Sequence, residues 1–328
     1  MPDLIHIFGT EFHHTLQCVK VANEIGYGEK TIISIQGLVS FYSKHMFANM
    51  PLNVIHSWTL RDILRFNNIY RSQKDFEKRG REEIAAIKGV KHVIGRTDWD
   101  EACVKLINPE VIYHKCNEIL RPSFYEGAWS YKGCEKHSIF VSQCSYPIKG
   151  FHQLIKMLPD IRKMYPDVHI YTTGISPLRR NIRKNSYTRY LEKLIHKNHL
   201  EDNVTFLGML DEKQMKERYL RSNVFCMCSS IENSPNSLGE AMALGVPVVA
   251  SDVGGVKNMM SHNEDGLIYP FDEEYMLPFY IGRLFRNGND VQAFSENARK
   301  HARDIFAKDI NAERLFSIYL GISKQHEL

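Results

Sequence analysis

The stretch IENSPNSLGEAMALGVPVVASDVGG, residues 231–255, decides the fold of this chain. The apolar run 225–228 before it predicts a strand, and Ser234-Pro235 predicts a helix start, with a hydroxyl cap followed by proline in the first turn. Gly245 suits the left-handed end of that helix, and Pro247 blocks its continuation. Residues 248–250 then predict a buried parallel strand. Strand, loop, helix and strand in this order indicate an open α/β sheet, whose ligands bind where strands end.

The loop and the helix start carry the candidate chemistry. The backbone N–H groups of Asn236, Ser237 and Leu238 lack partners inside a helix, so they predict a site for a phosphate-sized anion. Glu232 precedes the helix, and Glu240 lies about one turn inside it, where it could accept hydrogen bonds from two neighbouring hydroxyls such as those of a ribose. A single glutamate there is often only a solvated side chain or a partner of the helix dipole. Two of them on this frame favour a nucleotide-linked ligand.

The same stretch resembles the glutamate-x7-glutamate signature of the GT-B glycosyltransferases of family four, the glycosyl transferases group 1, and P-V-V-A-S-D-V-G-G continues the likeness. The resemblance covers nearly all of the second half. It implies a catalytic Glu232 beside the sugar of a nucleoside-diphosphate-sugar donor, Glu240 on the ribose, and the backbone of Asn236, Ser237 and Leu238 on the diphosphate. It also implies transfer to an acceptor hydroxyl with retention of configuration, without a metal or another cofactor.

Further donor-binding candidates come from loops after other strands. Lys149-Gly150 follows the first strand of the second half, where the lysine could neutralise a diphosphate. The resembling family usually has an arginine shortly before this pair, and this chain has Gln143 near that position. In the family the base is usually held by loop backbone, which here corresponds to Gly208 and Met209.

Alternating strands and helices predict two doubly wound parallel-sheet lobes of the GT-B type. We place the first, acceptor-side lobe at residues 1–133, the donor lobe at 134–307, and a crossing helix within 308–328 with Leu315, Phe316 and Tyr319 on one face. About 130 residues precede the second lobe, whereas six strand–helix units would need roughly 180. The family also begins with a glycine-rich strand and loop before the strand at which this sequence starts. We therefore expect a first lobe that is short at its N-terminus.

Loops after first-lobe strands supply candidates that reach the donor from across the cleft. On the acceptor side they are Gln36, Arg96, Thr97 and Asp98. His14 is a second catalytic candidate, although a lone loop histidine is more often solvated. The order of the strand motifs resembles a bacterial polysaccharide-type subgroup, which implies a glycan or lipid-linked acceptor.

Composition and charge indicate the compartment and the kinds of partner. Seven cysteines form an odd set without a disulfide framework, which favours a reducing compartment, the cytoplasm. The net charge of +4 is no indication of nucleic acid, and no apolar run approaches the ~20 residues that cross a bilayer. Basic residues gather in 61–91 and 179–197. Solvated helix faces explain both, but we hypothesise that the first contacts a membrane surface at the cytoplasmic face.

Three other readings stay open. The first is an epimerase of the non-hydrolysing kind on the same architecture, which would give an epimer of the sugar instead of a transfer product. The second is an NAD-linked dehydrogenase, suggested by Gly254-Gly255 but disfavoured because no strand–G-x-G-x-x-G–helix unit is present. The third is a non-catalytic sugar-nucleotide-binding or scaffold protein, suggested by the short first lobe.

Overall fold

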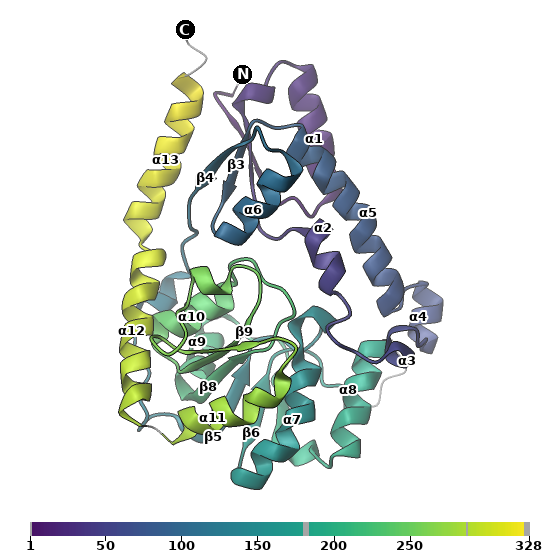
Figure 1. Cartoon of the computed structure of the whole chain (residues 1–328), viewed down its shortest axis with the longest axis vertical. Coiled ribbons are helices and arrows are strands. Elements are labelled where there is room, and N and C mark those ends of the chain that lie inside the picture. The colour runs from purple at the N-terminus through teal and green to yellow at the C-terminus, as the bar shows by residue number, and fades with distance from the viewer. Residues whose placement is uncertain (1, 180–183, 287, 325–328) are drawn as a thin grey trace.

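The computed structural model describes residues 2–179, 184–286 and 288–324, and its strands form two sheets that are parallel throughout (Figure 1). The first sheet has the order β1-β2-β3-β4, with β1 (Ile5–Phe8), β2 (Thr31–Ser34), β3 (His92–Gly95) and β4 (Ile112–Lys115). The second has the order β10-β9-β8-β5-β6-β7, with β5 (Glu135–Val141), β6 (His169–Thr172), β7 (Val204–Phe206), β8 (Ser222–Met227), β9 (Val248–Asp252) and β10 (Leu267–Pro270). The prediction of two parallel α/β lobes, the first one small, is confirmed.

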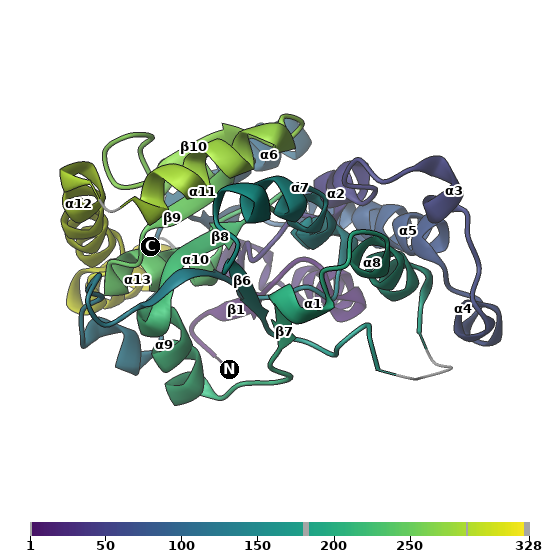
Figure 2. The same cartoon turned by 90° about the horizontal axis from the view of Figure 1, so that it is seen from below.

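Helices connect the strands of both lobes. The first lobe contains α1 (His13–Glu24), α2 (Val39–Tyr42), α3 (Leu52–Ile55), α4 (Leu60–Arg65), α5 (Ile69–Lys88) and α6 (Asp98–Ile107). The rest of the chain contains α7 (Phe151–Met164), α8 (Ser186–Lys197), α9 (Glu212–Arg221), α10 (Asn236–Leu244), α11 (Leu277–Phe285), α12 (Asn289–Ile305) and α13 (Lys308–Lys324). Figure 2 shows α7 and α11 on one face of the second sheet and α9 and α10 on the other. No helix in the described part of the chain is long and apolar enough to cross a bilayer.

The second lobe holds the larger core because both faces of its sheet are covered. Every residue of β8 is buried, and so are the first four residues of β9. Such strands read as continuous apolar runs, which is why the sequence revealed them. Aromatic rings fill the space between sheet and helices, with Phe140 and Tyr219 in edge-to-face contact at 4.9 Å. The loops that follow β8 and β9 therefore start from rigidly packed strands.

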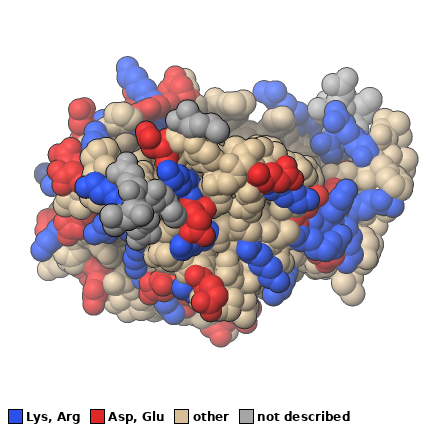
Figure 3. Space-filling model, turned by 90° about the horizontal axis from the view of Figure 1, so that it is seen from above, with Lys and Arg blue, Asp and Glu red and all other residues tan. Residues whose placement is uncertain are grey.

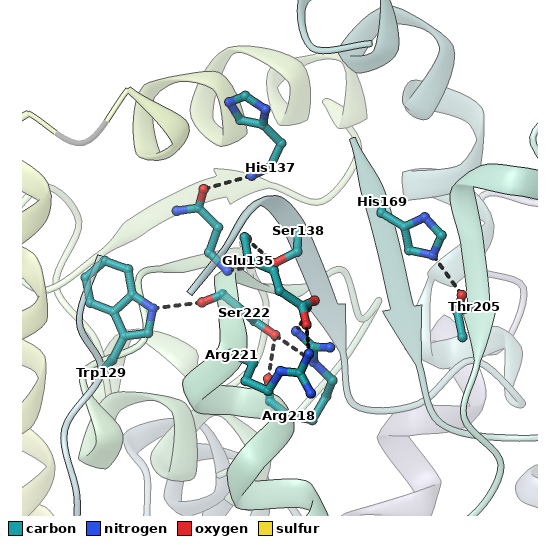
Figure 4. Close-up of polar contacts among 10 residues, drawn as sticks. Trp129, Glu135, His137, Ser138, His169, Thr205, Arg218, Arg221 and Ser222 are labelled. Atoms are coloured by element: carbon teal, nitrogen blue, oxygen red, sulfur yellow. Dashed lines mark hydrogen bonds and ion pairs between the residues drawn. The ribbon is translucent and has the colours of Figure 1, made fainter. Parts of the chain in front are cut away.

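Polar contacts anchor the beginning of β5 (Figure 4). Glu135 forms ion pairs with Arg221 and with Arg218, the latter at 2.9 Å. The indole N–H of Trp129 donates to the carbonyl oxygen of Ser222 at 2.7 Å. These contacts tie the chain to α9 and β8 as it enters the second sheet at Glu135, one residue after the start that we expected for the donor lobe.

Helix α13 returns to the first lobe. Its Tyr319 hydroxyl lies 2.6 Å from Nδ1 of His6 on β1, and Ile322 joins a small buried cluster with Ile32 of β2. Leu315 packs against the same cluster, but Phe316 is 61% exposed, so its predicted place on the packed face is wrong. One residue is about 100° of helix, which turns Phe316 away from the face that Leu315 shares with Ile322. Residues 325–328 of the expected segment lie outside the described residues.

The two chain segments that pass between the lobes touch each other. The Tyr125 hydroxyl, on the segment between β4 and β5, donates to the carbonyl oxygen of Phe306 at 2.7 Å, and Phe306 immediately follows α12. The same hydroxyl accepts a hydrogen bond from the backbone N–H of Leu120 at 2.9 Å. The Tyr125 hydroxyl thus holds together the two segments that cross between the lobes.

The lobes also meet through the loop after β8. Oγ1 of Thr97 donates to Oδ1 of Asn233 at 2.7 Å, and Nδ2 of Asn233 donates to the carboxylate of Asp100 at 2.8 Å. All three side chains are buried. Close by, the backbone N–H of Asp98 donates to Oδ1 of Asn258 at 3.2 Å. The start of α6 is therefore fitted against the loop that carries Glu232.

Replacement of Asn233 by alanine should loosen this contact. Because both hydrogen bonds are buried, we expect Asn233→Ala to lower the free energy of unfolding by about 1–3 kcal/mol and to increase the radius of gyration in X-ray scattering. Asn258→Ala is the matched control, because that amide makes its hydrogen bond to Asp98 at a more exposed place and should cost less. Equal effects of the two substitutions would contradict a special role for Asn233.

Gly150 and Gly208 both have left-handed backbone, but only at Gly150 would a side chain also collide with neighbouring atoms. Gly150 has φ +65°, and a Cβ there would lie 1.7 Å from the carbonyl oxygen of Cys228, whereas Gly208 has φ +75° with no atom within 4 Å of the same position. Gly208→Ala should therefore cost only the left-handed backbone, about 1–2 kcal/mol. Gly150→Ala adds a backbone collision and should cost more than about 3 kcal/mol. Urea denaturation measures both, and similar losses would disprove the distinction.

Candidate active site

The site lies at the point where the strand order of the second sheet reverses. From β5 the chain proceeds outward to β6 and β7, and from β8 it proceeds the other way to β9 and β10. The loops that leave β5 and β8 start from this point at the carboxyl edge of the sheet, where ligands of such folds bind. The backbone N–H of Ser230 donates to the carbonyl oxygen of Ile148 at 2.7 Å, which joins the two loops.

Lys149 and Glu232 come together at this point. Nζ of Lys149 donates to Oε1 of Glu232 at 2.6 Å, and the Ser229 hydroxyl donates to the same oxygen at 2.7 Å. Glu232 is only 6% exposed, so its charge depends on these partners. The sequence placed both residues in ligand-binding loops but did not predict that they pair.

Gly254 and Gly255, which follow β9, pack against the backbone of Glu232. The backbone N–H of Gly255 donates to the carbonyl oxygen of Glu232 at 3.1 Å. A Cβ on Gly254 would lie 1.8 Å from that same oxygen, and one on Gly255 would lie 2.5 Å from Cγ2 of Thr97. Residues without side chains are therefore required for the loop of Glu232 to contact both the loop after β9 and the first lobe.

Helix α10 begins at Asn236, and Pro235 occupies the N-cap position without a side-chain cap. The expectation that Ser234 caps the helix is wrong, because Pro235 has extended backbone (φ −70°, ψ 118°) and moves the start by one residue. The N–H of Leu238 donates to the carbonyl oxygen of Pro235 at 3.0 Å, so this predicted anion donor is already engaged. Asn236, which is exposed, and Ser237, which is half-buried, occupy the first two helical positions.

Glu240 has a partner that the sequence did not reveal. Arg121, which follows β4, donates from Nε to Oε1 of Glu240 at 2.8 Å and from Nη2 to Oε2 at 2.9 Å. Glu240 is buried, and burial raises the pKa of its carboxyl group while the hydrogen bond from Arg121 opposes that rise. Ribose hydroxyls at Glu240 would have to share or replace these two bonds.

The other predicted donor residues lie along the same edge of the sheet. Gln143 is half-buried in the loop after β5, and Gly150 is the N-cap residue of α7. Gly208 accepts a hydrogen bond from the N–H of Gly174 at 2.9 Å, and Met209 is 97% exposed. These last residues follow β7, three strand positions from β8, which is about 14 Å at 4.8 Å per strand. An extended ligand is needed to contact both Gly208 and Glu232.

In the first lobe, Arg96 and Gln36 belong to a network within the lobe. Arg96 is buried, and its Nη2 donates to the carbonyl oxygens of Ile35 and Gln36 at 2.8 and 3.1 Å. Glu118 accepts from Nη1 of Arg96 at 2.9 Å and from Nε2 of Gln36 at 2.6 Å. These contacts fix the loops after β2, β3 and β4 relative to one another.

Thr97 lies in the short loop after β3, as expected, but Asp98 already belongs to α6 and not to the loop. Thr97 is the N-cap residue of α6, where it forms a capping box with Asp100, and Asp98 is the first helical residue. Thr97 is buried against the second lobe. Hydrogen bonds from Asn258 and Lys115 lower the pKa of the Asp98 carboxyl group. Both residues thus hold the lobes together.

His14 is not brought to Glu232. It lies on the exposed side of α1, which begins at His13 rather than at the expected Thr15, and its ring stacks on Phe12 at 5.3 Å. It lines a surface hollow with Lys78 and Arg79 of α5. Its catalytic role stays a prediction without support from this placement.

Tyr42 is a first-lobe residue that the sequence analysis missed. Burial, followed by the nearby charge of Glu232, raises the pKa of its hydroxyl, and a hydrogen bond with the backbone of Asn233 opposes that rise. Tyr42 ends α2, a single turn that the sequence analysis did not predict. No local pattern marked Tyr42, because Glu232 and Asn233 are far from it in the chain.

The arrangement suits the stabilisation of negative charge that develops on a leaving group. A lysine and a buried carboxylate form an ion pair where the loops of the second lobe meet the first lobe, and the helix start of α10 follows that carboxylate in the chain. Preplaced donors of this kind lower the barrier of reactions that release an anion. Among the described residues, no group of three or more His, Cys, Asp and Glu side chains is arranged to hold a metal ion.

Comparison with known proteins agrees with this geometry. Residues 131–301, just over half of the chain, match the family described as glycosyl transferases group 1. Spore coat protein SA of Bacillus subtilis (strain 168) is 30% identical over 188 residues, which cover 56% of this chain and 48% of that protein. The chain spans about half the length of the curated relatives that it matches.

Solved structures share the fold at lower sequence identity. Sucrose-phosphate synthase from Thermosynechococcus elongatus has a TM-score of 0.73 at 18% identity, over 98% of this chain and 73% of that chain. HepE from Anabaena, in complex with UDP and glucose, has a TM-score of 0.62 at 15% identity, over 96% of this chain and 99% of that chain. With the family match and the site at the switch point, the chain belongs to the glycosyl transferases group 1 family.

Proposed function

We propose that this chain is a retaining glycosyltransferase that moves a sugar from a nucleoside diphosphate to an acceptor hydroxyl, in the synthesis of a cell-surface polysaccharide or glycoconjugate. The ion pair of Lys149 and Glu232 beside the start of α10 is the observation that carries the proposal. Membership of the family supports it. The complex of HepE with UDP and glucose makes UDP-glucose the first donor to test.

The proposed reaction uses the ion pair as a switch. Breaking the sugar–phosphate bond leaves negative charge on the diphosphate, which attracts the ammonium group of Lys149 and the amides of Asn236 and Ser237. Because the diphosphate of the bound donor is already anionic, it draws Lys149 away from Glu232 before the bond breaks, and the carboxylate is then free to hydrogen-bond the donor sugar. In the retaining reaction the departing phosphate helps to deprotonate the acceptor hydroxyl. Tyr42 faces this centre from the first lobe and excludes water.

The acceptor in this proposal is a glycan or a lipid-linked sugar. The enzyme acts in the cytoplasm, with peripheral contact to the cytoplasmic face of the membrane. The first lobe supports an acceptor role because its loops after β2, β3 and β4 are fixed by the network of Arg96 and Glu118 at the side that faces the second lobe.

Glu232→Gln should lower turnover far more than donor affinity. The substitution keeps the shape but removes the charge that acts on the reacting sugar, so we expect a loss of about 10²–10³-fold in kcat. Release of UDP from UDP-glucose measures turnover, and calorimetric titration with UDP measures affinity. Equal losses in both quantities would argue that Glu232 only helps to bind the donor.

Glu240→Ala should weaken nucleotide binding. Loss of a buried acceptor for the ribose hydroxyls predicts a decrease in UDP affinity of about 1–3 kcal/mol. Glu192→Ala is the matched control, because this partly buried glutamate of α8 pairs with Lys184 and not with Arg121. If Glu240→Ala binds UDP and GDP as tightly as the unchanged protein, the ribose assignment is wrong.

A non-catalytic sugar-nucleotide-binding protein is the second candidate function. The observation that favours it is the small first lobe, whose sheet has four strands in the described part of the chain. Tight binding of UDP-glucose with no release of UDP in the presence of glycan acceptors would support this alternative. Formation of an epimer of the sugar would instead indicate an epimerase.

A further inference from the structure

An apolar surface projects from the first lobe at residues 52–70, here named the α3–α4 tip. Figures 1 and 2 both place α3 and α4 at the outer end of the molecule, opposite α13. Leu64 is 79% exposed and Phe66 is 64% exposed. The exposed large apolar side chains of the tip are Leu52, Trp58, Leu60, Ile63, Leu64, Phe66 and Tyr70. So many in so short a segment mark a surface that contacts something apolar.

Hydrogen bonds at the start of α4 hold this helix with its apolar side facing outward. Thr59 and Asp62 form a capping box at the start of α4, and the Asp62 carboxylate also accepts from the N–H of Ser186 in the second lobe at 2.9 Å. Asp62 therefore points inward and is fully buried. Leu60 and Leu64 lie four residues apart on the opposite, exposed side of the helix. The exposure is built into the fold and does not arise from a frayed end.

Positive charge surrounds the apolar face. Asp62 is the only acidic residue between 52 and 74 in the sequence, and it is buried. The guanidinium group of Arg71 lies 3.5 Å from the ring centroid of Phe66. Lys and Arg gather at this end of the molecule in Figure 3. The basic residues of the tip and its surroundings are Arg61, Arg65, Arg71 and Lys74, with Arg189 and Lys193 of α8, which share a hollow with Trp58.

We propose that the α3–α4 tip docks on an anionic lipid bilayer, with its leucine and aromatic side chains in the headgroup region and its arginines on lipid phosphates. An apolar face rimmed by Arg and Lys has the charge and the composition of a membrane-surface helix. A projecting surface suits a flat bilayer better than it suits a groove-binding peptide. The surface is narrower than the basic segment 61–91, because the later part of α5 carries acids such as Glu77 and Glu82. Of the second basic segment, Arg180 and Arg183 lie outside the described residues.

The tip adjoins a cavity beside the loop that carries Lys149. The cavity has a volume of about 240 Å³ and is lined by Arg61, Asn67 and Phe76 of the first lobe and by Ser145 and Tyr146 of the second. Ser145 and Tyr146 belong to the loop that continues to Lys149. A sugar carried by a lipid in the docked bilayer would enter beside this loop. This consequence rests on the proposed function, whereas docking itself does not.

Sedimentation with vesicles tests the docking. The full chain should bind vesicles that contain phosphatidylglycerol and not vesicles of phosphatidylcholine alone. The double variant Leu64→Ser, Phe66→Ser should lose this binding, and Arg65→Glu, Arg71→Glu should weaken it by about tenfold or more. Leu106→Ser is the matched control, because Leu106 is 75% exposed on α6. Equal binding by the Leu64 and Phe66 variant and by the control would overturn the proposal.

Tryptophan fluorescence locates the contact. Of the three tryptophans, Trp58 is 40% exposed, Trp99 is partly buried on α6 and Trp129 is buried. The emission should shift to shorter wavelength when phosphatidylglycerol vesicles are added, and Trp58→Phe should remove the shift. No shift in the unchanged protein, or self-association through the tip without lipid in sedimentation velocity, would overturn the assignment.

Titration with UDP separates this inference from the proposed function. The tip variants should bind UDP as the unchanged protein does, because they alter no residue of the candidate active site. Unchanged thermal melting of each variant shows that the fold is intact. Loss of vesicle binding with unchanged UDP affinity supports the docking, whereas absence of UDP binding in every variant and in the unchanged protein counts against the proposed function alone.

Discussion

One ion pair, between the half-buried Lys149 and the buried Glu232, organises the candidate active site. A carboxylate with so little exposure is tolerated only beside a partner, because desolvation of a lone charge is expensive. The partner is available because β5 and β8 are neighbours in the sheet and their loops leave from the same edge. The reversal of strand order at this pair of strands thus gives the site both its position and its charge balance.

The position of Glu232 also depends on how the two lobes meet. The next residue in the chain, Asn233, is hydrogen-bonded to Thr97 and Asp100 of the first lobe, and the glycine pair after β9 admits Thr97 at close range. A shift of the first lobe would therefore move the loop of Glu232. In the proposed function, donor binding and lobe arrangement are therefore coupled through adjacent residues of one loop.

Local sequence patterns predicted the elements around residues 225–255 well, since their signals act over short range. The buried strand β9 and the left-handed Gly245 at the end of α10 are examples. The partner of Glu240 was missed because Arg121 is 119 residues away, and Thr97 is 136 residues from Asn233. Only the folded chain brings such residues together. The helix start was misplaced by one residue because proline usually occupies the first turn after a hydroxyl cap, whereas here Pro235 keeps extended backbone and is itself the N-cap residue.

The hydroxyl of Tyr125 joins the two places where the chain passes between the lobes. Because both crossings are fastened at one point, a rotation of the lobes about that point would have to break their other contacts, those of Asn233 with Thr97 and Asp100 and of Asp62 with Ser186. A small turn there would be magnified at the α3–α4 tip, because α3 and α4 lie across the molecule from the junction of α12 and α13 in Figure 1. Tilting of the second lobe against an immobilised first lobe would then admit and release nucleotide without detaching the protein from the surface that holds it.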